Sequence, residues 1–235
     1  MDMIVCPAYV NKPLPKELTM KLIIGNKNYS SWSLRPWLLL SAFDLAFEEV
    51  RISLFVEGFK AEIEKHSAAG KVPVLEDNGL VVWDSLAICE YVSEHYLEGR
   101  GWPEDVKMRA EARSCSAEMH SGFATLRNDM PMNCRACDRR VEMTPELQAD
   151  ISRIDSLWTS LTSKYSDQGP WLFGNFSIAD CMFAPVVFRF NTYDPEISKK
   201  ARDYIKTMLA HPKIKIWQDQ AANEVETIAY AEVGR

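Results

Sequence analysis

Two neighbouring segments carry residue types that could hold a peptide-like ligand. Pro73 opens an apolar strand candidate, although proline has no N–H to offer a neighbouring strand and fixes its φ at about −65°. If the Val72-Pro73 bond is cis, the turn leaves the N–H and C=O of Val72 unpaired toward solvent. An extended peptide-like ligand could then pair with this backbone, as an added strand pairs with the edge of a sheet.

A carboxylate site is expected one hairpin further along the chain. Asn78-Gly79 is typical of a type I′ turn and lies between the strand candidates 74–77 and 80–83. Asp84 or Ser85 can then cap a helix. Because the start of a helix has free N–H groups and a partial positive charge, it favours a carboxylate ligand. The alternative interpretation is an ordinary hairpin followed by a capped helix.

The composition is typical of a globular protein and argues against some partners. The chain has 235 residues, of which 47% are hydrophobic and 26% charged, enough for one domain or two small ones. Its formal net charge of −6 argues against nucleic acid as the main partner. No apolar run reaches membrane-spanning length, so no membrane partner is expected. Residues 1–19 show no secretory signal and are expected to form an irregular extension.

The cysteines predict a reduced, cytoplasmic protein without a metal. Cys89 and Cys181 lie on apolar stretches, where a thiol acts as a small hydrophobe. Cys134 and Cys137 have the C-x-x-C spacing of a redox pair or of half a zinc site. Because no second cysteine or histidine pair at a suitable spacing completes a metal site, we expect neither metal nor redox use.

The elements that must position these segments alternate in the first part of the chain. A strand at 22–24, a helix at about 32–42 and a strand at 50–54 precede a short helix, the hairpin and a closing helix. This order is typical of a thioredoxin-like sheet with helices on both faces. We therefore predict an α/β N-terminal thioredoxin-like domain at 20–98.

Beyond Trp102-Pro103 the periodicity is helical throughout. Apolar residues recur every three or four positions from Met108 to Leu126, which predicts one long helix with an apolar face. Because helical patterns continue to the end of the chain, we predict an all-α C-terminal domain at 104–235.

Several further helices are expected in this second domain. One begins at Thr144-Pro145, where a cap precedes a proline in the first turn. Another, highly apolar, begins at Ser177, where Asp180 would complete a capping box and serve folding rather than catalysis. Two last helices are expected at about 198–209 and 212–222.

Three motifs resemble those of the glutathione transferase superfamily. They are Lys71-Val72-Pro73-Val74-Leu75, Asp84-Ser85-Leu86-Ala87-Ile88 and Asn175-Phe176-Ser177-Ile178-Ala179-Asp180. The first loop, Tyr29-Ser30-Ser31-Trp32-Ser33-Leu34-Arg35, is similar to the Ser-Ser-Cys-Ser-x-Arg signature of the zeta class, but Trp32 stands in place of the cysteine. The chain thus resembles a serine-type, zeta-like or related bacterial member. The resemblance covers about 21–222 and implies the glutathione transferase fold, reduced glutathione as cosubstrate and a homodimer.

The resemblance further implies that Ser30 or Ser31 activates the glutathione thiol. The pKa of that thiol lies above neutrality, whereas the nucleophile is the thiolate. A serine hydroxyl that donates a hydrogen bond to the sulfur, close to a helix N-terminus, stabilises the anion and lowers that pKa. Both serines precede the helix expected near Trp32, and we favour Ser30. The alternative is that they only cap this helix.

The other glutathione contacts follow by matching position. The resemblance implies that Val72, beside Pro73, pairs its backbone with the cysteinyl part of glutathione, and that Lys71 reaches the glycine carboxylate. Ser85 would take the γ-glutamyl carboxylate, and Asp84 could meet the ammonium. For Lys71 the alternative is a solvated side chain.

The second substrate is expected between the domains, against the first long helix of the C-terminal domain. Candidate residues are Met119, Phe123, Arg127 and Arg135. Methionine and aromatic side chains make an adaptable apolar wall, whereas the arginines suit an anionic substrate. For Met119 and Phe123 we favour the alternative, a place in the core between helices.

The sequence predicts an enzyme that adds the glutathione thiolate to a small hydrophobic or anionic electrophile. A zeta-like cis–trans isomerase of the maleylacetoacetate isomerase type would share the first step, attack at an activated double bond, but would then release the sulfur. The fold also serves non-catalytic glutathione-binding or ligand-binding proteins, although a purely structural descendant would not need all of these motifs. A thioredoxin-like reductase is disfavoured because the first loop has no cysteine.

Overall fold

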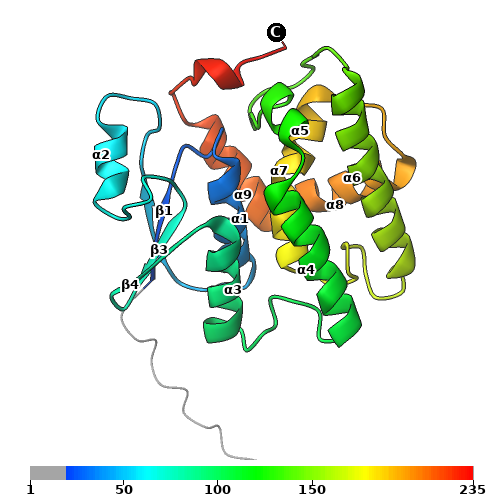
Figure 1. The fold of residues 1–235 in the computed structure, drawn as a ribbon, viewed down its shortest axis with the longest axis horizontal. Coiled ribbons are helices and arrows are strands. Elements are labelled where there is room, and N and C mark those ends of the chain that lie inside the picture. The colour runs from blue at the N-terminus through cyan, green and yellow to red at the C-terminus, as the bar shows by residue number, and fades with distance from the viewer. Residues whose placement is uncertain (1–19, 235) are drawn as a thin grey trace, which may run out of the picture.

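The computed structural model describes residues 20–234, and its first part is built on one four-stranded mixed sheet (Figure 1). The predicted irregular extension at 1–19 lies outside the described residues. The strands are β1 (Met20–Ile24), β2 (Glu48–Arg51), β3 (Val74–Asp77) and β4 (Leu80–Trp83), in the order β2-β1-β3-β4. Strand β1 pairs in parallel with β2 and antiparallel with β3, which pairs antiparallel with β4.

Helices cover both faces of this sheet because successive side chains of a strand point to opposite sides. Leu22 and Leu75 face the helices α1 (Ser31–Ala42) and α3 (Ser85–Tyr96) in the main core. Ile23 packs on the other face against the short helix α2 (Phe59–Glu64). This arrangement confirms the predicted thioredoxin-like fold.

The hairpin follows its sequence signals closely. The Val72-Pro73 bond is cis, as the position of the proline suggested. Asn78 and Gly79 both have positive φ values, 48° and 84°, as a type I′ turn requires. The carboxylate of Asp84 then caps α3 by accepting the N–H groups of its first turn.

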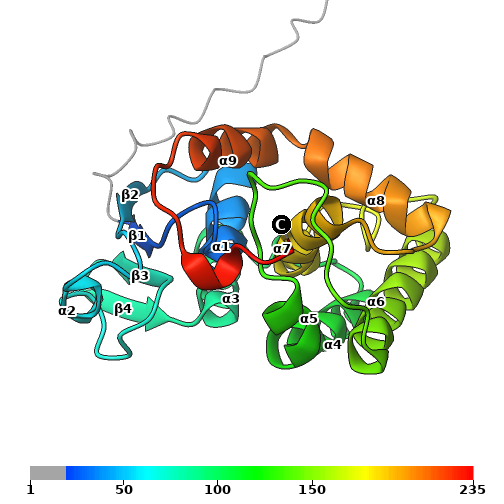
Figure 2. The ribbon, with the colours of Figure 1, turned by 90° about the horizontal axis from the view of Figure 1, so that it is seen from above.

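The second part of the chain is all-helical, as predicted. Its helices are α4 (Val106–Ser121), α5 (Ala124–Asp129), α6 (Pro145–Lys164), α7 (Ile178–Tyr193), α8 (Lys199–Ala210) and α9 (Pro212–Ala222), with a 3₁₀ turn, η1 (Ala229–Ala231), near the end. Every residue of α7 except Asn191 is buried, so α7 is the central helix of this part. It packs against α1, which therefore lies between the sheet and α7 (Figure 2).

The prediction of one long helix from Met108 to Leu126 is wrong, because the chain leaves the helix at Gly122-Phe123. Gly122 is extended and Phe123 is left-handed, with φ of 60°. Arg127 stabilises the break, since its guanidinium donates to the carbonyls of Met119, His120 and Gly122 that the end of α4 leaves free. The apolar positions expected from the sequence are still buried beyond the break, since Phe123 and Leu126 face the core.

The Ser177–Asp180 capping box is present and is extended by two further donors. One carboxylate oxygen of Asp180 accepts from the N–H and hydroxyl of Ser177 at 2.9 and 3.2 Å. The other accepts from the N–H of Leu172 and the hydroxyl of Tyr204 at 3.2 and 3.0 Å. Burial raises the pKa of Asp180 to about 6, so the carboxylate is ionised at pH 7. These contacts support the folding role expected for Asp180.

We predict that Asp180→Asn lowers the free energy of unfolding by about 2–4 kcal/mol at pH 7. The amide nitrogen cannot accept, so it leaves buried donors unpaired at one side of the carboxyl group. Urea denaturation would measure the loss. Asp203→Asn on the exposed side of α8 is the control and should change stability little. A loss below about 0.5 kcal/mol in Asp180→Asn would contradict this role.

Candidate functional site

Ser30 occupies the residue just before α1, at the end of the loop that leaves β1. Its hydroxyl lies 2.7 Å from the hydroxyl of Ser33, and either can be the donor. Among the described residues this side chain makes no capping hydrogen bond to the helix, so the capping interpretation does not hold for Ser30. Ser30 is 7% exposed, whereas Ser31, the first residue of α1, is half-buried.

Ser33 is a site residue that the sequence reasoning missed. It is fully buried, and its Oγ accepts a hydrogen bond from the N–H of Gly25 at 3.0 Å. Because the Oγ of Ser33 accepts this N–H, the hydroxyl proton of Ser33 is available to donate to Ser30. Ser30 would then keep its proton for a ligand. The only sequence signal was its place in the serine-rich first loop.

Val72 offers the backbone that the sequence analysis required. In the part of the chain that the structure describes, neither its N–H nor its C=O forms a hydrogen bond, since the β3 ladder begins at Val74. Pro73 is buried behind it, and the side chain of Lys71 is exposed. An extended ligand can therefore reach the Val72 backbone, and the position of Lys71 fits both of its interpretations.

Asp84 and Ser85 stand together at the start of α3. One oxygen of Asp84 accepts the N–H groups of Leu86 and Ala87 at 2.9 and 3.2 Å. The other lies 3.0 Å from Nε2 of His120 at the end of α4, so Asp84 joins the two parts of the molecule.

The environment of this pair favours negative charge. Ser85 is 1% exposed, and its hydroxyl accepts from Nη1 of Arg35 at 3.4 Å. Burial lowers the pKa of His120, which is therefore neutral at pH 7. The side of the site next to Ser85 thus combines a helix N-terminus with an arginine, two features that favour an anion.

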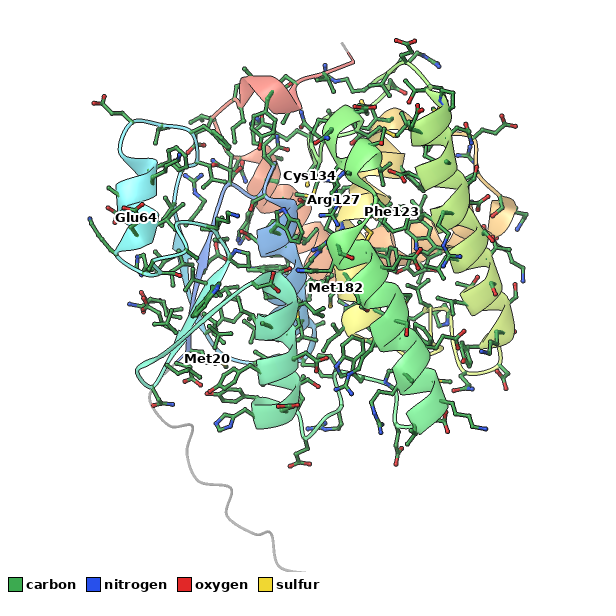
Figure 3. The ribbon with its side chains drawn as sticks, viewed as in Figure 1. Met20, Glu64, Phe123, Arg127, Cys134 and Met182 are labelled. Atoms are coloured by element: carbon green, nitrogen blue, oxygen red, sulfur yellow. The ribbon has the colours of Figure 1, made fainter. Side chains whose placement is uncertain are left out.

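The four residues predicted for the second substrate divide into two kinds. Met119 and Phe123 are 1% and 8% exposed and belong to the main core, which fits the alternative we favoured for them. Arg127, labelled in Figure 3, is half-buried. Its guanidinium lies over the ring of Trp32. Arg135 is exposed and contacts a different set of groups, namely Tyr29 and the carbonyls of Glu224 and Glu226.

Trp32, which replaces the cysteine of the zeta-like signature, lies where the two parts of the molecule meet. The guanidinium carbons of Arg35 and Arg127 lie 4.3 and 4.7 Å from the centroid of its ring. The ring of His120 approaches it edge-on, with 5.3 Å between centroids. The indole thus provides cation–π contacts for two arginines from different helices.

The segment 223–234, which we call the C-terminal segment, holds the loop between β1 and α1 in place (Figure 2). The carboxylate of Glu224 accepts the N–H groups of Lys27 and Asn28 at 2.7 and 3.0 Å. The hydroxyl of Tyr29 donates to Glu232 at 2.7 Å. The sequence analysis assigned no role to this segment. Its contacts are with residues close to the other end of the described chain, and no local sequence pattern indicates such contacts.

Cys134 and Cys137 are both free thiols. Burial raises the pKa of the Cys134 thiol above its ordinary value, which makes it a poor nucleophile. Within residues 20–234 no group of three or more His, Cys, Asp or Glu side chains is placed to hold a metal ion. No helix in the same range is sufficiently long and apolar to cross a membrane.

Comparison with known proteins identifies the family. Residues 29–95 match the model of the glutathione S-transferase N-terminal domain, and residues 144–217 match that of the C-terminal domain. Together with the fold, these matches show that the chain belongs to the glutathione S-transferase superfamily.

Individual relatives are more distant. A probable maleylacetoacetate isomerase of Caenorhabditis elegans is 26% identical over 172 residues, which cover 72% of this chain and 77% of the relative. The maleylacetoacetate isomerase of Rattus norvegicus is also 26% identical, covering 72% of this chain and 76% of its own length.

The fold is shared with solved glutathione transferases. A glutathione transferase homologue from Burkholderia, solved with bound glutathione, matches with a TM-score of 0.68 at 23% identity, covering 87% of this chain and 99% of its own. A theta-class enzyme from Xanthomonas axonopodis pv. citri, also with glutathione bound, matches with a TM-score of 0.63 at 18% identity and covers 89% and 100%.

We predict that Glu224→Ala speeds hydrogen exchange at the amides of Lys27 and Asn28 by about ten- to a hundredfold. A hydrogen bond from an N–H to a carboxylate is worth roughly 1.5–3 kcal/mol, and its loss lets the loop open more often. NMR or mass-spectrometric exchange would measure the rates. Glu226→Ala is the matched control, because Glu226 binds the side chains of Arg51 and Ser53 instead. Equal protection in both variants would contradict the proposed hold on the loop.

Proposed function

We propose that this protein is a glutathione transferase that binds reduced glutathione along Val72, Asp84 and Ser85 and adds its thiolate to a small electrophile. The observation that carries this proposal is the hydroxyl pair of Ser30 and Ser33. Gly25 N–H donates to Ser33. When Ser33 in turn donates to Ser30, the proton of Ser30 is free to be donated to a bound sulfur. The thiol proton passes to water and the thiolate stays beside this donor and the start of α1.

The rest of the glutathione molecule would extend away from Ser30 along the edge of the sheet. The cysteinyl backbone pairs with the free N–H and C=O of Val72, as a short added strand. The γ-glutamyl carboxylate meets Ser85 at the start of α3, and the ammonium meets Asp84. Lys71 is exposed, and its ammonium would meet the glycine carboxylate.

A glutathione-dependent cis–trans isomerase is the second candidate, and the named relatives favour it. The relative of Caenorhabditis elegans is named a probable maleylacetoacetate isomerase and that of Rattus norvegicus a maleylacetoacetate isomerase, and each match covers more than two thirds of both chains. Both reactions begin with attack of the thiolate on an electrophilic carbon. With chlorodinitrobenzene the sulfur replaces chloride and stays on the ring, whereas in the isomerisation the new carbon–sulfur bond is broken again. Parallel assays with chlorodinitrobenzene and maleylacetone, each with glutathione, would separate them by product.

The homodimer stays a prediction, supported by the apolar edge of the sheet. On the outer strand β4, Leu80, Val81 and Trp83 are 46%, 37% and 57% exposed. An exposed apolar edge strand is a surface that proteins normally cover. Sedimentation equilibrium would decide the question, since a monomer at micromolar concentration would contradict the dimer.

We predict that Ser30→Ala raises the pKa of the bound glutathione thiol by about 1–2 pH units. The loss of one hydrogen bond to a charged acceptor, roughly 1.5–3 kcal/mol, corresponds to that change. The ultraviolet absorbance of the thiolate, titrated against pH, would report it. Ser31→Ala is the control and should leave the titration unchanged, whereas Ser33→Ala should shift it in the same direction by less. If only Ser31→Ala shifted the titration of the bound thiol, Ser31 rather than Ser30 would be the serine that activates it.

We predict that Ser85→Ala weakens glutathione binding about ten- to a hundredfold, because the γ-glutamyl carboxylate loses its hydroxyl donor. Isothermal titration calorimetry would measure the dissociation constant. Ser93→Ala, the same substitution at a buried position two turns along α3, is the matched control and should bind glutathione as the unchanged protein does. Unaltered binding in Ser85→Ala would overturn the placement of glutathione.

A further inference from the structure

Lys27 is a buried lysine in the loop between β1 and α1, shortly before Ser30. Its side chain is 3% exposed. Nζ lies 5.0 Å from the centroid of the Trp37 ring on α1 and 5.3 Å from that of the Trp217 ring on α9. Helices α1 and α9 are in contact (Figure 2), and the two indoles meet at 62° with 5.0 Å between their centroids. The ammonium group therefore makes cation–π contacts with both rings.

The ammonium group of Lys27 also has two polar partners. It donates to the carboxylate of Glu49 on β2 at 2.7 Å and to the amide oxygen of Gln220 on α9. The same carboxylate accepts from Nε1 of Trp37 at 2.6 Å. The charge thus has a counter-ion, and this counter-ion also holds one of the two indoles.

The backbone of Lys27 is held as well. Its N–H donates to the carboxylate of Glu224 in the C-terminal segment at 2.7 Å, and its C=O accepts from Nε1 of Trp217 at 2.9 Å. Trp217 therefore contacts both the side chain and the backbone of this residue. Through Lys27 the loop is joined to β2, α1, α9 and the C-terminal segment.

The hydrogen bonds of the loop connect Lys27 to Ser30. The N–H groups of Tyr29 and Ser30 donate to the carbonyl of Asn26 at 3.2 and 2.8 Å. Residues 26–30 thus form one turn with Lys27 inside it, and α1 begins directly afterwards. A shift of Lys27 would therefore change the direction in which the hydroxyl of Ser30 points.

Packing alone does not account for a charged side chain at this place. Burial lowers the pKa of Lys27, which reflects the cost of removing the ammonium group from water. A methionine side chain of similar length would fill the space between the indoles without that cost. What the charge adds is direction, because hydrogen bonds from one ammonium group to two fixed acceptors hold the loop in one geometry.

Lys21 shows the ordinary case of a lysine–glutamate pair in the same region. On β1 its Nζ lies 3.6 Å from the carboxylate of Glu48 on β2, and the two side chains are 35% and 56% exposed. An ion pair that is open to water in this way contributes little. Because Glu48 is next to Glu49 in the same strand, the Lys21 pair is a matched control for the Lys27 pair.

We propose that Lys27 is a positioning residue, which fixes the direction of the Ser30 hydroxyl by holding the turn 26–30 against the two indoles and Glu49. The part of this inference that concerns the thiol rests on the proposed function. The hold on the turn does not, so the two parts can be tested separately.

Amide hydrogen exchange tests the hold on the turn. Lys27→Met keeps the length of the side chain but removes the ammonium group, and we expect the amides of Tyr29 and Ser30 to exchange about ten- to a hundredfold faster. Lys21→Met should exchange at these amides as the unchanged protein does. If Lys27→Met also exchanges there at the unchanged rate, the proposed hold is overturned.

Titration of the bound glutathione thiol tests the effect on Ser30. We expect Lys27→Met to raise the pKa of this thiol by about 0.5–1 pH unit, less than Ser30→Ala does, because the hydroxyl is present but held less firmly. The double variant should titrate as Ser30→Ala does, since Lys27 acts through that hydroxyl. A further shift in the double variant would mean that Lys27 acts directly by its charge, and would overturn the positioning role.

Glu49→Gln is the second variant, because it keeps the shape of the carboxylate but removes the counter-ion. We expect a smaller shift of the thiol pKa in the same direction, and this variant carries the test if Lys27→Met does not fold. A lower melting temperature with an unchanged thiol pKa in the folded variants would show a purely structural role and overturn the inference.

The outcomes for Ser30→Ala separate this inference from the proposed function. If Ser30→Ala shifts the thiol pKa and neither Lys27→Met nor Glu49→Gln does, the inference fails alone. If Ser30→Ala leaves the thiol pKa unchanged, the proposed function fails, and the exchange rates still decide whether Lys27 holds the turn.

Discussion

The rest of the structure depends on helix α1, which is buried on two sides. The helix lies between the sheet and α7, and Leu34, Leu38, Leu39 and Leu40 are fully buried along it. Each such leucine stabilises the fold by about 1.5–3 kcal/mol, so α1 cannot move without unpacking both parts of the molecule. Ser30, just before its first turn, and Arg35, one turn into the helix, are therefore fixed relative to each other.

The loop that leads into α1 is held by polar contacts rather than by packing. Glu224 is 6% exposed at its side chain and receives two backbone N–H groups of that loop. Such charge-assisted bonds have strict geometry, which suits a loop that must present one hydroxyl in one direction. The apolar core thus fixes the helix, and the C-terminal segment fixes the few residues before it.

The sequence was informative wherever a local signal was sufficient. Asn78-Gly79, Thr144-Pro145 and the capping box at Ser177 each fix a turn or a helix start through their own backbone, and the structure has all three. The break at Gly122-Phe123 was not predictable from the period, because an arginine four residues further on caps the exposed carbonyls. The apolar pattern itself continues through the break.

The candidate site likewise has a part that local sequence signals predicted and a part that they did not. The backbone of Val72 and the position of Asp84 and Ser85 follow from local rules about proline and helix starts. Ser33 and the C-terminal segment act only through contacts formed after folding. Trp32 was visible as a departure from the family pattern, but its role depends on arginines that come from α1 and α5.

The proposed thiolate site and Arg35, whose guanidinium lies over Trp32, are close on the same helix, and their charges interact. Ser30, Trp32 and Arg35 lie within about one and a half turns of α1, so the arginines also favour a thiolate beside Ser30. The positive charge that favours the proposed thiolate therefore comes from a side chain that the doubly buried helix holds in one place.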